Sequence, residues 1–180
     1  MSTDERYFLL HTMEAQFLNA FPQTPPAVLE AYRAAGFDPA RKLPAYEYAI
    51  WRRCLAVQRE AFFPGLPPDE GYEALGRQYS ASYLETTMGR ALSVLLKLLS
   101  TRRMFGRLER VFRSGNTFSR VSVSDESPSE LLLEVNDVFC ESPRYLVGML
   151  ERGFAAFGRE VKLTPRAHAQ DRATFHVRFS

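Results

Sequence analysis

The sequence predicts an α+β fold, in which a helical half (residues 1–113) packs on a four-stranded antiparallel sheet formed by residues 114–180 in the order strand, strand, helix, strand, strand. Two observations carry this prediction. The last segment, 173–179, alternates apolar and polar residues with a period of two, which is typical of a strand with one buried face. The chain before Ser114 instead repeats its apolar residues at helical spacing between proline-rich loops.

The first predicted helix starts at Ser2, which forms a capping-box pattern with Glu5, and runs to about Phe21 before prolines break it. A second, short helix is predicted over residues 27–35. It should end at Gly36, because glycine readily adopts the left-handed conformation common at helix C-termini.

Two further helices and a long helical stretch complete the first half. One helix carries an apolar stripe and stops at the prolines of residues 63–68. Its stripe consists of Tyr48, Trp51, Leu55, Gln58 and Phe62. No proline interrupts residues 69–100, which predicts about 30 residues of helix, longer than usual, with a break near Gly89. A last short helix over 102–112 is predicted to end at the turn 114–116.

Two hairpins are predicted in the second half. Segments 118–123 and 130–138 flank a polar turn at 124–129, and segment 160–164 is joined to the last strand by a turn at 170–172. On the last strand and its partner, one apolar face is expected to be buried. It consists of Val161, Leu163, Ala173, Phe175, Val177 and Phe179.

An amphipathic helix separates the hairpins. Ser142 is the predicted N-cap, Pro143 the first helical residue and Gly158 the left-handed residue after the last turn. Because its apolar stripe must be buried, we expect the helix to cover the sheet through residues such as Met149 and Phe154. The stripe consists of Tyr145, Leu146, Met149, Leu150, Gly153, Phe154 and Phe157.

The composition indicates a soluble single domain, residues 1–180, in the cytoplasm. Hydrophobic residues make up 46% of the chain, but no apolar run is long enough to span a membrane and no signal-peptide pattern is present. Free thiols at Cys54 and Cys140 are favoured over a disulfide, as is usual in a reducing cytosol. The net charge of +2 gives no general nucleic-acid footprint.

No residue pattern predicts a metal, a cofactor or catalysis. His11, His168 and His176 lack cysteine or carboxylate partners at metal-ligand spacing, and His176 falls on the polar face of the last strand. Cys54 and Cys140 have no neighbouring histidine in the sequence that would activate a thiolate. The glycines form no dinucleotide-binding or phosphate-binding loop. We therefore expect a protein that is not an enzyme and carries no cofactor.

Six short motifs, spread over most of the chain, resemble a paralogous family of uncharacterised proteins expanded in myxobacteria. They are KLPAY (42–46), FPGLPPDE (63–70), LGR (75–77), YLET (83–86), GRAL (89–92) and FRSGN (112–116). The six motifs together are distinctive of this family, whereas each motif alone is weak support for the resemblance. This resemblance implies no catalytic or ligand residues.

The order of helices, hairpin, helix and hairpin is similar to that of four-vinyl-reductase domains, TRAPP transport subunits and haem nitric-oxide-binding domains. The similarity implies small-molecule sensing, acyl-chain binding or protein assembly rather than catalysis. Residues 79–83 are similar to the Tyr-x-Ser-x-Arg signature of the haem sensors, but Tyr83 stands where the arginine belongs. No histidine lies between residues 12 and 167, so haem bound in that manner is not expected.

Four aromatic residues are the candidates for a ligand pocket between the helices and the sheet. They are Trp51, Tyr72, Tyr79 and Tyr83. Tyrosines can line an apolar pocket and still form a hydrogen bond to a ligand. The alternative interpretation is that these side chains belong to the hydrophobic core.

Arg103, Arg107 and Arg110 follow one another at steps of four and three, so on one helix they would share a face. Such a basic strip suits phosphate, another small anion or an acidic protein partner. The alternative is a solvated face with Glu109 as a neighbour.

Two functions from different classes fit these observations. The first is a non-catalytic regulatory or sensory module that binds a small molecule or an acyl-type ligand in a pocket between helices and sheet. The alternative is a protein-interaction or scaffold subunit that acts as a homodimer through a helix face and binds no ligand. An apolar pocket would favour the first function, whereas a closed core with one large exposed apolar patch would favour the second.

Overall fold

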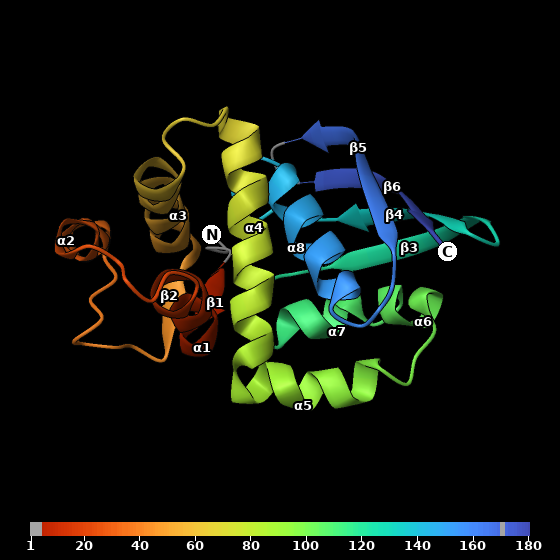
Figure 1. Ribbon diagram of the computed structural model, residues 1–180, viewed down its shortest axis with the longest axis horizontal. Helices are drawn as coiled ribbons and strands as arrows, with labels where there is room; N and C mark the ends of the chain where they lie inside the picture. Colours follow the sequence, from red (N-terminus) through yellow and green to blue (C-terminus); the bar gives the residue numbers. More distant parts are fainter. Residues whose placement is uncertain (1–4, 170–171) are drawn as a thin grey trace.

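The computed structural model describes residues 5–169 and 172–180. In chain order, its elements are β1 (Tyr7–Leu9), α1 (Leu10–Glu14), the π-helix η1 (Ala15–Asn19), α2 (Pro26–Ala35), β2 (Ala45–Glu47), α3 (Tyr48–Phe62), α4 (Pro68–Glu85), α5 (Thr87–Leu96), α6 (Thr101–Phe105), α7 (Leu108–Arg113), β3 (Val121–Ser127), β4 (Glu130–Val135), α8 (Arg144–Ala155), β5 (Val161–Ala169) and β6 (Arg172–Phe179). Helix α4 runs through the middle of the molecule, with α2 and α3 on one side and α8 and the larger sheet on the other (Figure 1). The predicted α+β fold is confirmed.

The larger sheet has the strand order β3-β4-β6-β5 and is antiparallel throughout. In the β4–β6 register, Leu133 faces Phe175 and Leu131 faces Val177, and all four side chains are buried. Leu163 of β5 faces Val177 and is also buried. Helix α8 packs against β5. The predicted buried sheet face beneath a helix is therefore confirmed. Two of its predicted residues, Val161 and Phe179, are only half-buried.

The first hairpin differs from the prediction in its turn. Strand β3 extends to Ser127, so most of the predicted turn 124–129 is strand and only the last two of its residues form the turn. A bulge between Asp125 and Ser127 accommodates the extra residue. The Arg102 guanidinium donates hydrogen bonds to the carbonyl oxygens of Ser127 (2.6 Å) and Pro128 (2.9 Å). This contact comes from a distant helix, which the local composition does not reveal.

The ends of two other strands also differ from the prediction. Strand β4 ends at Val135 instead of residue 138, because the Asp137 carboxylate accepts the backbone N–H of Phe139 (2.7 Å) and turns the chain. Strand β5 is longer than the predicted segment 160–164 and has a bulge near Pro165. Of the predicted turn at 170–172, the first two residues lie outside the described residues.

Helix α8 begins one residue later than predicted, at Arg144, with Pro143 as its N-cap. The Ser142 hydroxyl still accepts the backbone N–H of Arg144 (3.2 Å), and it donates to Asp69 at the start of α4 (2.6 Å). Gly158 has a φ of 69°, as predicted for the left-handed residue after the helix.

The N-terminal segment contains a strand where a helix was predicted. Residues 7–9 pair with residues 45–47 as β1 and β2, so helical structure begins only at Leu10. It continues into the π-helix η1 and ends at Asn19. Ser2, the predicted N-cap, lies outside the described residues. The pairing of segments far apart in the chain explains the difference.

Helices α2 and α3 confirm the predictions for these segments. Gly36 follows α2 with a φ of 106°, as expected for a helix that ends at glycine. No helix within residues 5–169 and 172–180 combines the length and hydropathy needed to cross a membrane.

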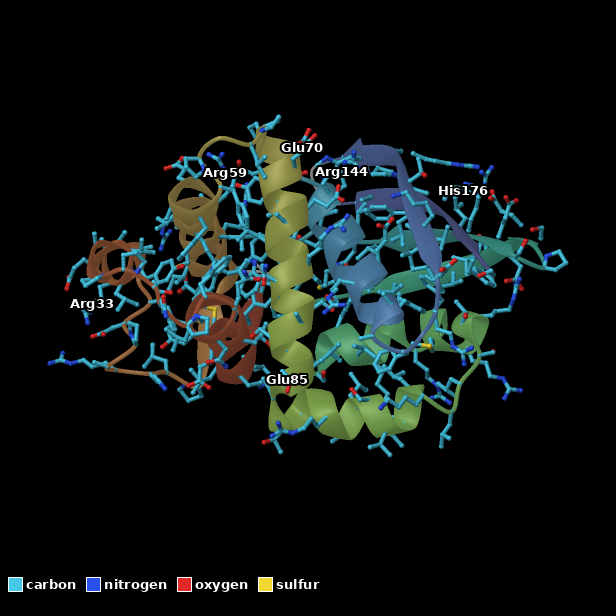
Figure 2. All side chains as sticks on the ribbon, in the orientation of Figure 1. Arg33, Arg59, Glu70, Glu85, Arg144 and His176 are labelled. Carbon is cyan, nitrogen blue, oxygen red and sulfur yellow. The ribbon has the colours of Figure 1, made fainter. Side chains whose placement is uncertain are left out.

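The break predicted near Gly89 in the long helical stretch is confirmed and lies three residues earlier, at Thr86. Helix α4 ends at Glu85, labelled in Figure 2, and α5 turns sharply away from it. The Thr86 hydroxyl accepts the N–H of Gly89 (3.0 Å) and caps α5. A β-carbon at Gly89 would overlap the carbonyl oxygen of Tyr83, so this glycine allows α5 to start close against the end of α4.

The predicted helix over 102–112 is two helices, α6 and α7, separated at Gly106 and Arg107. Glycine lowers helix propensity, and the Arg107 backbone departs from helical geometry with a φ of −106° and a ψ of −2°. Arg103 therefore lies on α6, Arg107 is the N-cap of α7, and Arg110 lies within α7. The prediction that these three arginines share one helical face is wrong.

Helices α4 and α8 pack with almost no space between their backbones. A β-carbon at Gly76 would overlap the carbonyl oxygen of Tyr145, and one at Gly148 would overlap the carbonyl oxygen of Glu73. The two glycines thus let each helix backbone contact the other. Arg144, labelled beside α4 in Figure 2, adds an ion pair with Glu73 (3.2 Å).

Candidate functional site

A partly open cavity of about 100 Å³ lies where the second half of α4 meets α5, α7 and α8. Its lining is mainly aromatic and aliphatic. It consists of Phe8, Thr12, Trp51, Tyr79, Ser80, Tyr83, Leu84, Leu92, Leu96, Met104, Leu108, Val111, Phe112, Gly115, Asn116, Phe139, Tyr145, Met149, Leu150, Gly153, Phe154 and Phe157. Apolar cavities of roughly 150 Å³ stay dry and bind benzene or xenon, so a space of this kind suits one small apolar molecule.

Three of the four predicted pocket residues line this cavity. The rings of Trp51 and Tyr79 meet edge to face with centroids 6.2 Å apart, and the rings of Tyr79 and Tyr83 lie 5.6 Å apart. Tyr72 is buried but lies outside the lining, and burial raises its pKa to about 12. The structure thus brings Trp51, Tyr79 and Tyr83 together and leaves Tyr72 in the core.

The Trp51 indole is fixed by a turn with unusual backbone geometry. Its N–H donates to the carbonyl oxygen of Phe139 (2.8 Å), and Phe139 is the one described non-glycine residue with a positive φ, 67°. The buried Asp137 carboxylate holds this turn, because it accepts the Phe139 N–H (2.7 Å), the Tyr48 hydroxyl (2.7 Å) and a guanidinium N–H of Arg6 (2.9 Å). A conformation of this kind costs about 1–3 kcal/mol and persists only where the surroundings hold it.

A second buried network occupies the polar end of Tyr145. The Tyr145 hydroxyl donates to the side-chain oxygen of Gln16 (2.7 Å). The Gln16 amide in turn donates to Gln58 (2.6 Å), and the Gln58 amide donates to the Gln16 backbone carbonyl (2.7 Å). Since these polar atoms are paired within the protein, Tyr145 presents mainly its ring to the cavity.

Other hydroxyl groups at the cavity are also paired. The Tyr83 hydroxyl lies 3.2 Å from the Ser114 hydroxyl, and the Thr12 hydroxyl donates to the carbonyl oxygen of Gly115 (3.1 Å). Burial raises the pKa of Tyr79, Tyr83 and Tyr145, so these tyrosines are neutral near pH 7. The arrangement offers an uncharged, apolar space and supplies no charged group to a ligand.

The cavity also contains residues that the sequence patterns did not single out. Thr12, Asn116 and Phe139 reach it from three separate segments, and Met104 reaches it from α6. Of these residues, only Asn116 lies in a recognisable sequence pattern, the glycine-asparagine pair at 115–116. This pair was interpreted as a turn and not as part of a cavity. The others converge through tertiary packing.

The basic residues divide between two places. Arg107 and Arg110 line a surface groove of about 470 Å³ beneath α5, whereas Arg103 is exposed on α6 outside it. Glu109, the expected neighbour of this strip, instead accepts the backbone N–H of Val121 at the start of β3 (2.9 Å).

None of the three histidines lines the cavity. His11 comes closest, with its ring centroid 6.2 Å from that of Tyr83. His168 is exposed. His176, labelled over the sheet in Figure 2, lies on the polar face as expected, opposite to the buried Phe175 and Val177. Its side chain is 12% exposed and lies near the carboxylates of Glu126 (3.4 Å) and Glu130 (3.8 Å).

The two cysteines are unpaired and buried. Burial raises the pKa of the Cys54 thiol to about 12 and also raises the pKa of the Cys140 thiol. Both are therefore protonated near pH 7, which opposes a nucleophilic role. Among the described residues, no group of three or more His, Cys, Asp or Glu side chains is arranged to hold a metal ion.

Comparison with solved structures defines the class of fold as that of H-NOX domains. A Cs H-NOX mutant carrying 4-cyano-L-phenylalanine aligns with a TM-score of 0.73 at 15% identity, covering 96% of this chain and 96% of that one. An oxygen-binding H-NOX domain related to soluble guanylate cyclases, in its oxygen complex, aligns with a TM-score of 0.67 at 15% identity over 93% of each chain. An Fe(II) unliganded H-NOX mutant from K. algicida gives 0.63 at 7% identity over 96% of each chain.

The chain belongs to the family described as "Protein of unknown function (DUF2378)", which matches residues 7–180. A search of the curated proteins found no match. The expected architectural similarity to haem nitric-oxide-binding domains is confirmed at the level of the fold. The expected grouping with myxobacterial proteins, and the similarity to the other two classes of domain, stay predictions.

Another of the similar H-NOX structures is described in terms of haem distortion. The residues that line the cavity of this protein do not fit a haem group. The lining residues, all within the described part of the chain, include no histidine or cysteine. The volume of about 100 Å³ is also below the roughly 300–1,000 Å³ of typical ligand pockets. Tyrosine can hold haem iron as a phenolate, but the raised pKa values of Tyr79, Tyr83 and Tyr145 oppose that form.

Proposed function

We propose that this protein is a non-catalytic sensory or regulatory module that binds one small apolar molecule in the cavity beside α4. The observation that carries the proposal is the apolar cavity among the helices, which no described residue of the four-stranded sheet lines, so the expected position between helices and sheet is corrected. The hydroxyl groups of Thr12, Tyr83 and Tyr145 are already hydrogen-bonded within the protein. Such a site gains affinity from the burial of apolar surface and contributes no charged group to a ligand.

The fold and the chemistry of the cavity lining support this function over catalysis. The H-NOX fold includes an oxygen-binding domain, so a small uncharged ligand is compatible with this architecture. The buried thiols and neutral tyrosines offer no activated nucleophile or general base near the cavity. The buried, unpaired cysteines also support the cytoplasmic location expected for the protein.

The cavity volume narrows the class of ligand. At about 100 Å³ it suits a molecule of the size of xenon or benzene rather than a long acyl chain. The acyl-type ligand considered from the sequence therefore does not belong in this space.

Methyl NMR spectroscopy tests the proposal. On titration with benzene, the methyl signals of Leu92, Leu108 and Leu150 should shift in a saturable manner, because these side chains line the cavity. A Leu150→Trp variant should lose the shifts, since the larger ring fills the space. The matched control is Leu66→Trp, which adds the same ring at a partly exposed loop residue and should bind benzene like the unmodified protein.

Two results would contradict the proposal. One is the absence of saturable shifts at the cavity leucines. The other is an equal response of both tryptophan variants while circular dichroism shows that both remain folded.

A second candidate function is a scaffold that forms a homodimer through α5. Exposed apolar side chains gather on this helix and the turn after it, with Val94 67%, Leu95 65% and Leu98 84% exposed. Apolar surfaces of this kind often mark interfaces. Sedimentation equilibrium would favour this function if the ligand-free protein were a dimer and Leu95→Gln/Leu98→Gln were a monomer.

A further inference from the structure

The surface groove between α5 and α7 has the dimensions of a ligand site of its own. Its volume is about 470 Å³, within the range of roughly 300–1,000 Å³ typical of small-molecule pockets. Along one side lie apolar side chains of α5 and the turn after it, including Met88, Leu95 and Leu99. The other side carries the side chains of Arg107 and Arg110.

The two arginines lack a counter-charge. Within the described residues, neither Arg107 nor Arg110 forms an ion pair or a side-chain hydrogen bond, whereas nearby Arg102 binds Asp125 and two backbone carbonyl oxygens. The groove lining contains no acidic residue. Glu109 turns its carboxylate toward the backbone N–H of Val121. The groove therefore presents two guanidinium groups that can receive an anion.

The apolar side of the groove extends onto exposed surface. Met88 is 47% exposed and Leu95 65% exposed within the groove lining, and Val94 and Leu98 continue the apolar surface beside it. An inorganic anion would bind the arginines and leave this surface in water. An uncharged apolar molecule would cover the surface and leave the arginines without a partner.

We propose that the groove binds a free fatty acid, with its carboxylate on Arg107 and Arg110 and its acyl chain along the apolar side chains of α5. Guanidinium and carboxylate groups form charge-assisted hydrogen bonds, often in pairs, and the burial of each methylene of the acyl chain favours binding. The inference is independent of the small-molecule site proposed in the cavity, because Arg107 and Arg110 would bind the carboxylate and neither arginine lines the cavity.

The two sites nevertheless share one wall. Leu92, Leu96 and Val111 line both the groove and the cavity. In addition, the Ser114 hydroxyl of the groove lies 3.2 Å from the Tyr83 hydroxyl of the cavity. A fatty acid in the groove would thus pack against the outer side of the layer that encloses the cavity.

Isothermal titration calorimetry of the delipidated full chain with monomeric laurate tests the proposal. We expect one laurate per chain, and weaker binding of dodecanol, which has the same chain without the carboxylate. Arg107→Gln/Arg110→Gln should weaken laurate binding by about tenfold or more, because the variant removes the charge-assisted hydrogen bonds to the carboxylate. The matched control is Arg103→Gln/Arg113→Gln, which removes the same charge from exposed arginines outside the groove and should change the affinity by less than about twofold.

Four outcomes would overturn the proposal. Laurate binding could be equally weakened in both double variants, or dodecanol could bind as tightly as laurate. Laurate could fail to bind while vesicles containing phosphatidylglycerol do, which would indicate a membrane-docking face. Finally, the ligand-free protein could be a dimer to which laurate does not bind and which laurate does not dissociate. That result would assign the groove to the interface with a second copy. The Leu150→Trp variant separates the two sites, because it should abolish benzene binding and leave laurate binding unchanged.

Discussion

The two ends of α4 meet their neighbours in opposite ways. In its first half, up to Gly76, the glycines Gly76 and Gly148 bring the backbones of α4 and α8 into direct contact. Toward its end, the break at Thr86 turns α5 sideways along α7, and both the cavity and the groove lie there. Apolar side chains are abundant in both regions, so the open space results from the direction of α5 and not from a lack of apolar residues. A helix packed closely in its first half can thus leave open space beside its end.

Phe175→Ala should produce the largest effect, in the closely packed part of the molecule. The side chain is fully buried in the hydrophobic core, so its truncation should lower the free energy of unfolding by about 3–5 kcal/mol. Urea denaturation followed by circular dichroism measures the change. An unchanged midpoint would show that this part is not the close-packed core described here.

Gly148→Ala should be the next most disruptive change, since a β-carbon there overlaps the carbonyl oxygen of Glu73. Overpacking of this kind costs about 1–3 kcal/mol. Gly65→Ala is the matched control, because no atom lies within 4 Å of its added β-carbon. If both variants unfold at the same urea concentration, the helices are not in backbone contact.

Alkaline pH should weaken the fold through its buried tyrosines. Burial raises the folded-state pKa of Tyr72 from 10.0 to about 12, so its contribution is complete below pH 10 and is lost as the pH rises toward 12. Tyr72→Phe should therefore make the free energy of unfolding fall less steeply between pH 10 and 11 than in the unmodified protein. Parallel pH profiles of the two proteins would contradict this assignment.

Val94→Gln/Leu98→Gln should have the smallest effect on stability, within about 0.5 kcal/mol, because both side chains are largely exposed. A much larger loss, measured by the same denaturation experiment, would mean that α5 is buried in solution by a partner. The contrast between the two ends of α4 would then describe an interface rather than a free surface.

Local patterns predicted the parts of the fold that depend on local spacing. The alternation around Phe175 and the stripe around Leu150 were enough to predict hairpin, helix and hairpin. The same patterns missed the strand at residues 7–9, because that strand exists only through pairing with residues 45–47. They also predicted the helix break near Gly89, and the chain turns three residues earlier, at Thr86, because Gly89 permits a close approach of α5 to the end of α4.

Helical spacing likewise revealed only some of the residues of the candidate site. Trp51, Tyr79 and Tyr83 belong to helical stripes that the spacing reveals, and all three reach the cavity. Phe139 reaches it only because the buried Asp137 carboxylate holds a left-handed turn, and nothing local marks Asp137 as buried. Side chains that meet from distant segments are outside the reach of local periodicity.

Crystals of the protein under xenon pressure provide the most direct test of the central claim, our proposal that the apolar cavity beside the end of α4 binds a small apolar ligand. Xenon should appear in the cavity between Tyr83, Leu108 and Leu150, and none should appear between Gly76 and Gly148. A cavity without xenon in a well-occupied derivative, or xenon between the two glycines, would contradict the claim.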